Sequence, residues 1–312
     1  MPRGMKRLAA ALLAFVWGAQ AALAGAPKVV ASIPPLHALA AAVMKGIGKP
    51  VLLIRDGSSV HHHALKPSDA RALEAADVVV LTSYGLEHFL QGRLRTLAPY
   101  AQIVQAGKLK GIRLLPRRAL NPPGSGASPG AGEDHNGINW HIWLDPENAK
   151  VIALRLAEIL TRRDGEHGAL YAANAANLAK ALDAQTQAIG TLLAPVRERP
   201  FIVAHDATRY FEARFGLHAL ASIEPAGGSE PGLGRLMALV KLARAHPGIC
   251  VFMTPDAPGK WGRLLAREGK ARIMTIDPLG LTLTPGPGLY PQLLRNLGEA
   301  FAHCLRHYSH KK

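Results

Sequence analysis

The sequence predicts an α/β protein with two lobes, each a mostly parallel sheet flanked by helices, joined by a long rigid helix. Apolar runs of strand length alternate with helical segments both before residue 165 and after residue 199. An alanine-rich stretch of high helical propensity, residues 166–198, separates these two parts. The chain has 312 residues, which is more than one hydrophobic core usually holds, about 250 to 300 residues.

The first 24 residues have the pattern of a cleaved signal peptide. A basic start is followed by an apolar run over residues 8–22, and Ala22-Leu23-Ala24 fits the A-x-A cleavage pattern. Cleavage after Ala26 is an alternative. A transmembrane anchor is disfavoured because the apolar run is short for a span. We therefore expect an exported, periplasmic protein.

Net charge and composition restrict the partners. The formal charge is +15, and three of these cations lie in the predicted signal peptide, which leaves +12 on the mature chain. The charges are scattered through helical segments and aromatic residues make up only 5% of the chain. We therefore expect no nucleic-acid partner, and we interpret the charge as a solvated surface that can favour an anionic membrane face or partner.

The chain contains two cysteines, Cys250 and Cys304. An even pair in an exported protein favours one disulfide over two free, buried thiols. On the chain-entropy view, closing a loop of this length would stabilise the fold by about 4 kcal/mol. A cysteine-based metal site is not expected, because the sequence has no CxxC motif.

We assign the N-terminal lobe to residues 25–165. Pro67 suits the first position of a helix and Asp69 complements the positive helix end. The continuous apolar run 77–82 is typical of a strand buried on both faces of a parallel sheet. Residues 121–139, rich in proline and glycine, predict a flexible surface insertion. The remaining expected strands are 29–33, 51–54 and 103–104, and the expected helices are 36–44, one that starts at 67, and 86–94.

The connecting helix, within residues 166–198, is expected to run unbroken over 169–193, because leucine and isoleucine recur there at helical spacing. A rigid helix of that length would fix the separation of the lobes. Residues 199–312 then form the C-terminal lobe. Its expected strands are 201–204, 217–223, 249–253 and 273–276, and its expected helices are 208–215, 236–245, 261–268 and 291–307.

Four polar side chains lie at or near predicted strand ends or helix starts: His61, His141, His205 and Asp277. Because ligands bind outside the carboxyl ends of strands in open α/β sheets, these positions suit a site. Neutral imidazole and carboxylate are ligands of tetrahedral zinc. Local pattern alone is weak support, since the chain has 14 histidines.

Four segments, in order along nearly the whole mature chain, resemble the metal-binding subunits of bacterial zinc uptake transporters, the ZnuA-related members of the metal-specific solute-binding proteins. The segments are His61-His62-His63-Ala64-Leu65-Lys66-Pro67-Ser68-Asp69, Trp140-His141-Ile142-Trp143-Leu144-Asp145-Pro146, Val203-Ala204-His205-Asp206-Ala207 and Thr275-Ile276-Asp277-Pro278-Leu279-Gly280.

The resemblance implies that His61, His141 and His205 are metal ligands, with Asp277 as the carboxylate on the second lobe. It also implies a disulfide between Cys250 and Cys304. The protein would be a monomer without enzymatic activity, which captures Zn2+ as cargo in the cleft between its lobes. It would deliver the ion to the membrane permease of an ABC transporter.

Within the family pattern, counting back from residues 65–69 places the first ligand on His61. His62 and His63 would be loop residues that could form a secondary capture site. The third ligand is a histidine, where manganese and iron relatives carry a carboxylate suited to harder ions, so His205 points to zinc. Val60 stands where some members have a glutamate, which leaves Asp277 or water as the fourth ligand. The insertion holds one histidine, unlike the long histidine-rich loop of many zinc members.

Two other classes of function remain open. A zinc hydrolase would need a general base, for which Asp206 or Glu87 is a candidate, but the sequence has no HExxH motif. The second class is a manganese or iron transport subunit, or an adhesin-like surface protein, of the same fold. We expect Glu87 to be a solvated helix residue, and Asp206 to orient His205 or cap the next helix. The histidines near the end, at 303, 307 and 310, suggest a frayed, solvated terminus.

Overall fold

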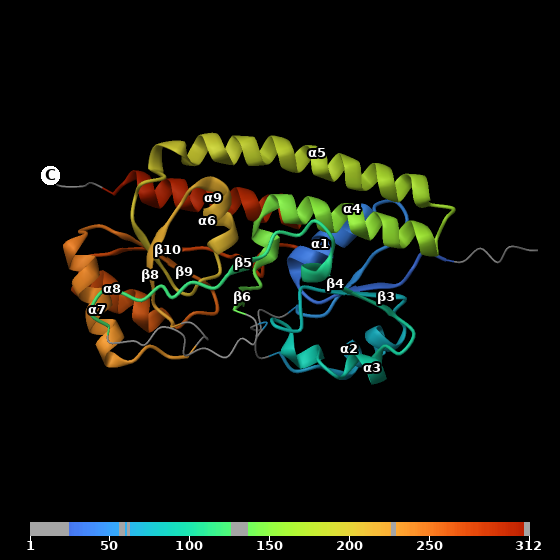
Figure 1. Cartoon of the computed structure of the whole chain (residues 1–312), viewed down its shortest axis with the longest axis horizontal. Coiled ribbons are helices and arrows are strands. Elements are labelled where there is room, and N and C mark those ends of the chain that lie inside the picture. Colours follow the sequence, from blue (N-terminus) through green and yellow to red (C-terminus); the bar gives the residue numbers. More distant parts are fainter. Residues whose placement is uncertain (1–24, 56–59, 61–62, 126–136, 226–228, 309–312) are drawn as a thin grey trace, which may run out of the picture.

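The computed structural model describes residues 25–55, 60, 63–125, 137–225 and 229–308. The predicted signal peptide, the candidate ligand His61 and its neighbour His62 lie outside these residues, as does most of the predicted insertion. The architecture is the predicted one: two parallel four-stranded sheets flanked by helices, side by side along the long axis, with a long helix running over both (Figure 1).

The N-terminal sheet has the strand order β2-β1-β3-β4, and all its pairs are parallel. Its strands are short, and β3 is buried along its whole length, as expected for a central strand. The strands are β1 (Val29–Ala31), β2 (Val51–Leu52), β3 (Val78–Leu81) and β4 (Gln102–Gln105). The helices are α1 (Pro34–Val43), α2 (Pro67–Glu74) and α3 (Leu94–Leu97). The helix expected over 86–94 is instead a 3-10 turn, His88–Leu90, followed by the separate α3.

The C-terminal sheet has the order β10-β9-β7-β8 and is also fully parallel. Because every strand runs the same way, all four carboxyl ends meet at one edge, where the candidate ligands of this lobe are found. The strands are β7 (Phe201–Val203), β8 (Ala219–Ser222), β9 (Cys250–Met253) and β10 (Arg272–Thr275). The helices are α6 (Arg209–Phe215), α7 (Leu233–Ala245) and α8 (Gly259–Gly269).

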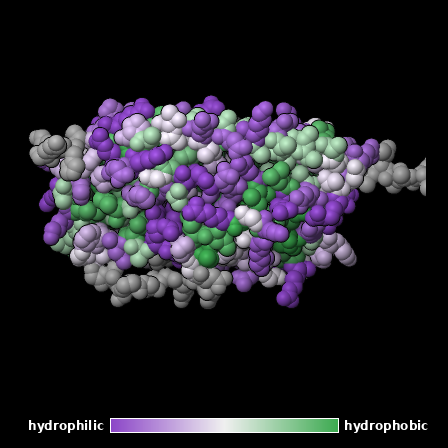
Figure 2. All heavy atoms as spheres, turned by 45° about the horizontal axis from the view of Figure 1, so that its top comes forward, coloured by the Kyte–Doolittle hydropathy of each residue, from purple (hydrophilic) through white to green (hydrophobic). Residues whose placement is uncertain are grey.

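Three long helices join the lobes: α4 (Pro146–Arg163), α5 (Gly168–Leu193) and α9 (Leu289–Arg306). The α5 helix has 26 residues and packs against α4 at one end and α9 at the other. The α9 helix also contacts α1, so the chain's last helix touches the first lobe. One continuous core includes residues from both sheets and from all of these helices. The outer side of α4 and α5 is largely hydrophilic, with separate apolar patches (Figure 2).

A feature that the sequence did not predict lies between the lobes. The two-residue strands β5 (Leu115–Pro116) and β6 (Ile138–Asn139) form a small antiparallel sheet. The chain then continues from β5 onto the second lobe, where the Ser222 amide donates to the carbonyl of Leu120 (3.0 Å). This crossing segment, residues 117–125, brings part of the first half of the sequence to the edge of the second sheet.

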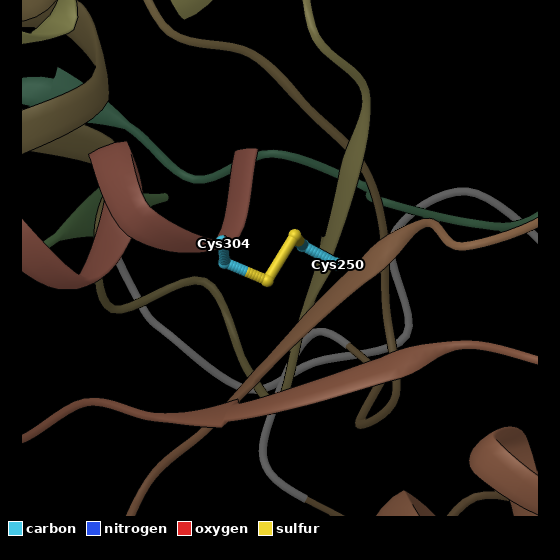
Figure 3. Close-up of a disulfide and its surroundings, with 2 residues drawn as sticks. All are labelled: Cys250 and Cys304. Carbon is cyan, nitrogen blue, oxygen red and sulfur yellow. A yellow bond between two sulfur atoms is a disulfide. The ribbon is translucent and has the colours of Figure 1, made fainter. Parts of the chain in front are cut away.

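The disulfide between Cys250 and Cys304 is present and joins β9 to the last turns of α9 (Figure 3). Its two Cα atoms are 6.0 Å apart and it closes a loop of 54 residues, as predicted. None of the helices in the described part of the chain combines the length and apolar character that a membrane crossing requires.

Candidate metal centre

His141 and His205 come together between the lobes. His205 lies two residues after the last residue of β7, and His141 lies two residues after β6. Their ring centroids are 5.5 Å apart, with an angle of 49° between the ring planes. Two imidazoles that share one tetrahedral zinc at about 2.0 Å per Zn–N bond place their centroids about 5 Å apart. The observed separation therefore suits a shared metal ion.

Asn139 holds His141 in place. Its Oδ1 accepts from the backbone N–H of His141 (3.0 Å) and lies 3.0 Å from the ring Nδ1 of the same residue. An amide oxygen can only accept, so this contact places a proton on Nδ1 and the lone pair on Nε2, which is the form of imidazole that binds a metal through Nε2. The side chain of Asn139 is buried, which fixes this geometry.

The same asparagine connects His141 to the segment that carries His205. Its Nδ2 donates to the backbone carbonyl of Asp206 (2.5 Å) and lies 3.3 Å from the Asp206 carboxylate. Arg118, on the crossing segment, forms ion pairs with both Asp206 and the buried Glu212 of α6. Although burial opposes it, hydrogen bonds and charge from Glu212 and Asp206 raise the pKa of Arg118, so the guanidinium stays charged. Asp206 thus holds the two ligand-bearing segments together through the hydrogen bonds that its carboxylate accepts from Arg118 and Asn139.

Asp277 follows β10 and closes a turn. Its Oδ1 accepts from the Leu281 amide (3.0 Å), and its Oδ2 accepts from the amide and hydroxyl of Thr282 (both 2.8 Å). A carboxylate offers about four lone-pair positions, of which three are occupied here. One position on Oδ1 remains, which limits Asp277 to a single bond with a metal.

A buried tryptophan connects the His141 segment to the Asp277 turn. The indole Nε1 of Trp143 donates to the carbonyl of Pro278 (2.8 Å), and the Tyr290 hydroxyl donates to the Trp143 carbonyl (2.6 Å). Both aromatic side chains are fully buried. The three described ligand candidates are therefore positioned by neighbours that span the two lobes.

His141, His205 and Asp277 line one pocket, whose other walls are mostly apolar. Asp256 also lines it, and sequence reasoning missed this residue. A signal existed, because Asp256 follows β9 as Asp277 follows β10. The lining residues are Val60, His141, His205, Pro255, Asp256, Asp277, Pro278, Leu279 and Leu281.

Burial and the neighbouring carboxylates set the protonation of the pocket. Burial lowers the pKa of His205, partly opposed by the charges of Asp256 and Asp206, so this imidazole is neutral at pH 7 as a metal ligand must be. Burial together with the charge of Asp256 raises the pKa of Glu224, at the end of β8, to about 7. The carboxyl edge of this sheet is therefore a region of negative potential that favours a cation.

The expectation for Glu87 was wrong. Glu87 is fully buried rather than solvated: its carboxylate accepts from the Ser32 hydroxyl (2.6 Å) and from the amides of Thr82 (2.8 Å) and Ser83 (3.0 Å). Burial raises its pKa despite these donors. His63 is a loop residue, as expected, and it is buried, with its ring against Phe89 and its Nε2 3.6 Å from Asp69.

The candidate ligand His61 lies outside the described residues. Among the residues that the structure describes, no three histidine, cysteine, aspartate or glutamate side chains form a ready-made metal cluster. The described part of the centre is thus a pair of imidazoles beside the Asp277 turn.

Two parallel α/β lobes joined by a long helix, with histidines gathered between them, define a solute-binding protein of the metal-specific class. The family model of ZnuA, the periplasmic zinc-uptake complex component A, matches residues 29–304. The chain therefore belongs to the ZnuA family, whose members are transport components and not enzymes. The periplasmic description agrees with the predicted export.

Individual relatives agree with this assignment. The chain is 38% identical over 326 aligned positions to the high-affinity zinc uptake system protein ZnuA of Brucella abortus (strain 2308), covering 96% of this chain and 97% of the relative. A crystal structure of ZnuA has a TM-score of 0.77 at 24% identity, covering 90% of this chain and 99% of that one. A ZnuA deletion mutant with zinc bound has a TM-score of 0.76 at 24% identity, covering 90% and 98%. Both structures share the fold described above.

Proposed function

We propose that this chain binds Zn2+ between its lobes through His61, His141 and His205, with the carboxylate of Asp277 or a water molecule as fourth ligand. The observation that carries the proposal is the approach of His141 and His205 to a centroid distance of 5.5 Å. These residues come from different segments, and Asn139 contacts both segments.

The donor set favours zinc over harder ions. Imidazole nitrogen is a good ligand for zinc, whereas manganese and magnesium prefer carboxylate and water oxygen. Asp277 offers one oxygen position because its others are used in the turn, which suits four-coordinate zinc better than a metal that requires six oxygens. The apolar walls formed by Pro278, Leu279 and Leu281 exclude water and strengthen the bonds between metal and ligands.

In this proposal the protein is a monomer that releases zinc to the membrane permease of an ABC transporter. Residues 25–165 form the first lobe, 166–198 the connecting helix and 199–312 the second lobe. Bound zinc is cargo, so the affinity must combine tight capture with release at the permease. The predicted signal peptide, residues 1–24, delivers the chain to the periplasm.

Calorimetric titration of the mature, metal-free protein with zinc tests this assignment. We expect one tight site, and a loss of affinity of at least about 100-fold in His141→Ala and His205→Ala, because each removes a direct ligand. His218→Ala is the matched control, since His218 is an exposed histidine on the second lobe. Unchanged tight binding in His141→Ala and His205→Ala would refute the site.

Metal selectivity and the fourth ligand need separate measurements. Competition between zinc and manganese for the metal-free protein should favour zinc by several orders of magnitude if three imidazoles bind. Asp277→Asn keeps an oxygen acceptor but removes the charge, so it should lower zinc affinity if Asp277 is the fourth ligand and leave it unchanged if water is. Preferential retention of manganese would favour the alternative transport subunit.

A further inference from the structure

A second pair of histidines lies far from the cleft, at the end of α9. His303 and His307 are one helical turn apart and both are exposed. Their ring centroids are 5.2 Å apart, with 67° between the ring planes. In Figure 1 this end of α9 lies at the end of the molecule that is opposite β3 and β4. The pair is therefore separate from the cleft.

The geometry of this pair suits a shared cation. Side chains four residues apart on a helix are neighbours, with Cβ atoms about 5 to 6 Å apart. Two imidazoles on one tetrahedral ion require centroids about 5 Å apart, and the observed 5.2 Å meets this condition before any ion is added. The rings thus need little rearrangement to bind one metal through two nitrogens.

The helix end that carries the pair is held in place, contrary to the frayed terminus expected from the sequence. Cys304, next to His303, is joined to β9 by the disulfide (Figure 3). Tyr308, next to His307, is buried, and its hydroxyl lies 3.1 Å from the Nδ1 of His246. Arg199 also donates to the Tyr308 carbonyl. Both histidines are therefore flanked by anchored residues, which lowers the entropy lost on chelation.

The charged side chains nearest the pair offset each other. The last turn of a helix carries the negative end of the helix dipole. Glu299, one turn before His303, adds a negative charge, and Arg306 adds a positive one. All of these side chains are exposed, so solvent screens their charges and the two nitrogen ligands provide most of the binding.

We propose that His303 and His307 form a second, weaker site for a borderline divalent cation such as Zn2+ or Ni2+, with water in the remaining positions. The site is open, so its ion exchanges rapidly with solution. It does not depend on the cleft, and its occupancy would appear as a second equivalent of zinc in any titration of the mature protein.

Zinc titration of the untagged mature protein, with its disulfide intact, tests the proposal. We expect a tight equivalent and a weaker one. Removing one of two chelating rings in His307→Gln should weaken the second equivalent by about 100-fold, while the tight one is unchanged. The double variant His303→Gln/His307→Gln should abolish it. The matched control, His88→Gln/His218→Gln, removes two exposed histidines that come from different lobes.

Retention on an immobilised Ni2+ resin gives an independent measurement on protein that already holds one equivalent of zinc. The wild type and the control should elute together, and the His303→Gln/His307→Gln variant should elute at lower imidazole. Because both rings are exposed, the variant should melt at the wild-type temperature without metal. If the weak equivalent and the retention persist in this variant, or if the control loses them equally, the proposal is overturned.

Discussion

Replacing Asn139 by leucine is expected to weaken zinc binding by about 10- to 100-fold, although Asn139 does not touch the ion. The substitution removes the acceptor that orients the His141 ring and the donor to the Asp206 carbonyl. The ring then samples other orientations and the other tautomer, and only a fraction of molecules presents Nε2 to the metal. A 10- to 100-fold loss corresponds to about 1.4 to 2.7 kcal/mol, the cost of leaving one buried polar group unsatisfied.

The assay is a competition titration with a zinc chelator, and the control is Asn174→Leu. Asn174 also makes two backbone hydrogen bonds, to the carbonyls of Val43 (3.0 Å) and Lys45 (2.8 Å), but it lies on α5 away from the pocket. Both variants should lose stability, and only Asn139→Leu should lose affinity. Asn139→Asp separates the two roles: it retains the acceptor for His141 but repels Asp206, so it should bind zinc well and melt early. Equal affinities for Asn139→Leu and Asn174→Leu would refute the positioning argument.

Three further outcomes are expected. Zinc affinity should fall as pH drops through about 6.5, because protons compete for the ligands; since burial lowers the pKa of His205, that ring should resist protonation longest. Because the His205 pKa is depressed only in the folded state, the unfolded chain binds this proton more readily, and the metal-free protein should lose stability below about pH 6.5 in urea unfolding. Zinc affinity and unfolding free energy that stay constant from about pH 7.5 to about pH 5 would contradict both statements. Arg118→Met leaves Asp206 and the buried Glu212 without their cation. The free energy of unfolding in urea should therefore fall by about 3 kcal/mol. A decrease below about 1 kcal/mol would show that these ion pairs behave like solvated surface pairs. Replacing Cys250 and Cys304 by alanine should cost about 4 kcal/mol for the 54-residue loop, and no change in the unfolding midpoint would contradict the chain-entropy view.

Local patterns predicted the elements of both lobes well, because strands such as β3 are buried on both faces and read as unbroken apolar runs. The connecting helix was expected within residues 166–198, and α5 begins at Gly168, after the end of α4 at Arg163. By contrast, β5 and β6 have two residues each, and β6, with the buried Asn139, occupies the last two residues of the stretch predicted as a flexible surface insertion. Two residues are too few to show a strand periodicity, so the sequence pattern could not predict this sheet. It forms because segments more than 20 residues apart pair with each other just before His141.

Residues whose environment comes from distant segments were the hardest to place. Glu87 follows a predicted helix start, yet its carboxylate is buried against Ser32, which follows β1. Asp206 was expected to serve His205 or the next helix, but its partner Arg118 comes from the crossing segment. In contrast, Asp256 was within reach of sequence reasoning, since it follows a strand as Asp277 does. Strand ends predict which residues reach an edge, but not which distant side chains meet them there.

The packing between the lobes restricts how zinc enters and leaves. A wide opening would break the Trp143–Pro278 and Tyr290–Trp143 hydrogen bonds and would separate α9 from α1 within a continuous core. Each buried polar group left unpaired costs about 1 to 3 kcal/mol, so a hinge motion of that kind is too costly for routine release.

We therefore expect capture and release to involve only small shifts around the pocket. In small-angle X-ray scattering, the radius of gyration of the mature protein should change by less than about 1 Å between the metal-free and zinc-loaded forms. Trp143→Phe removes the indole donor while it keeps an aromatic ring, so this variant should show a larger difference between the two forms and faster zinc release to a chelator. A large contraction of the wild type on zinc binding would show that the shared core does not hold the lobes together.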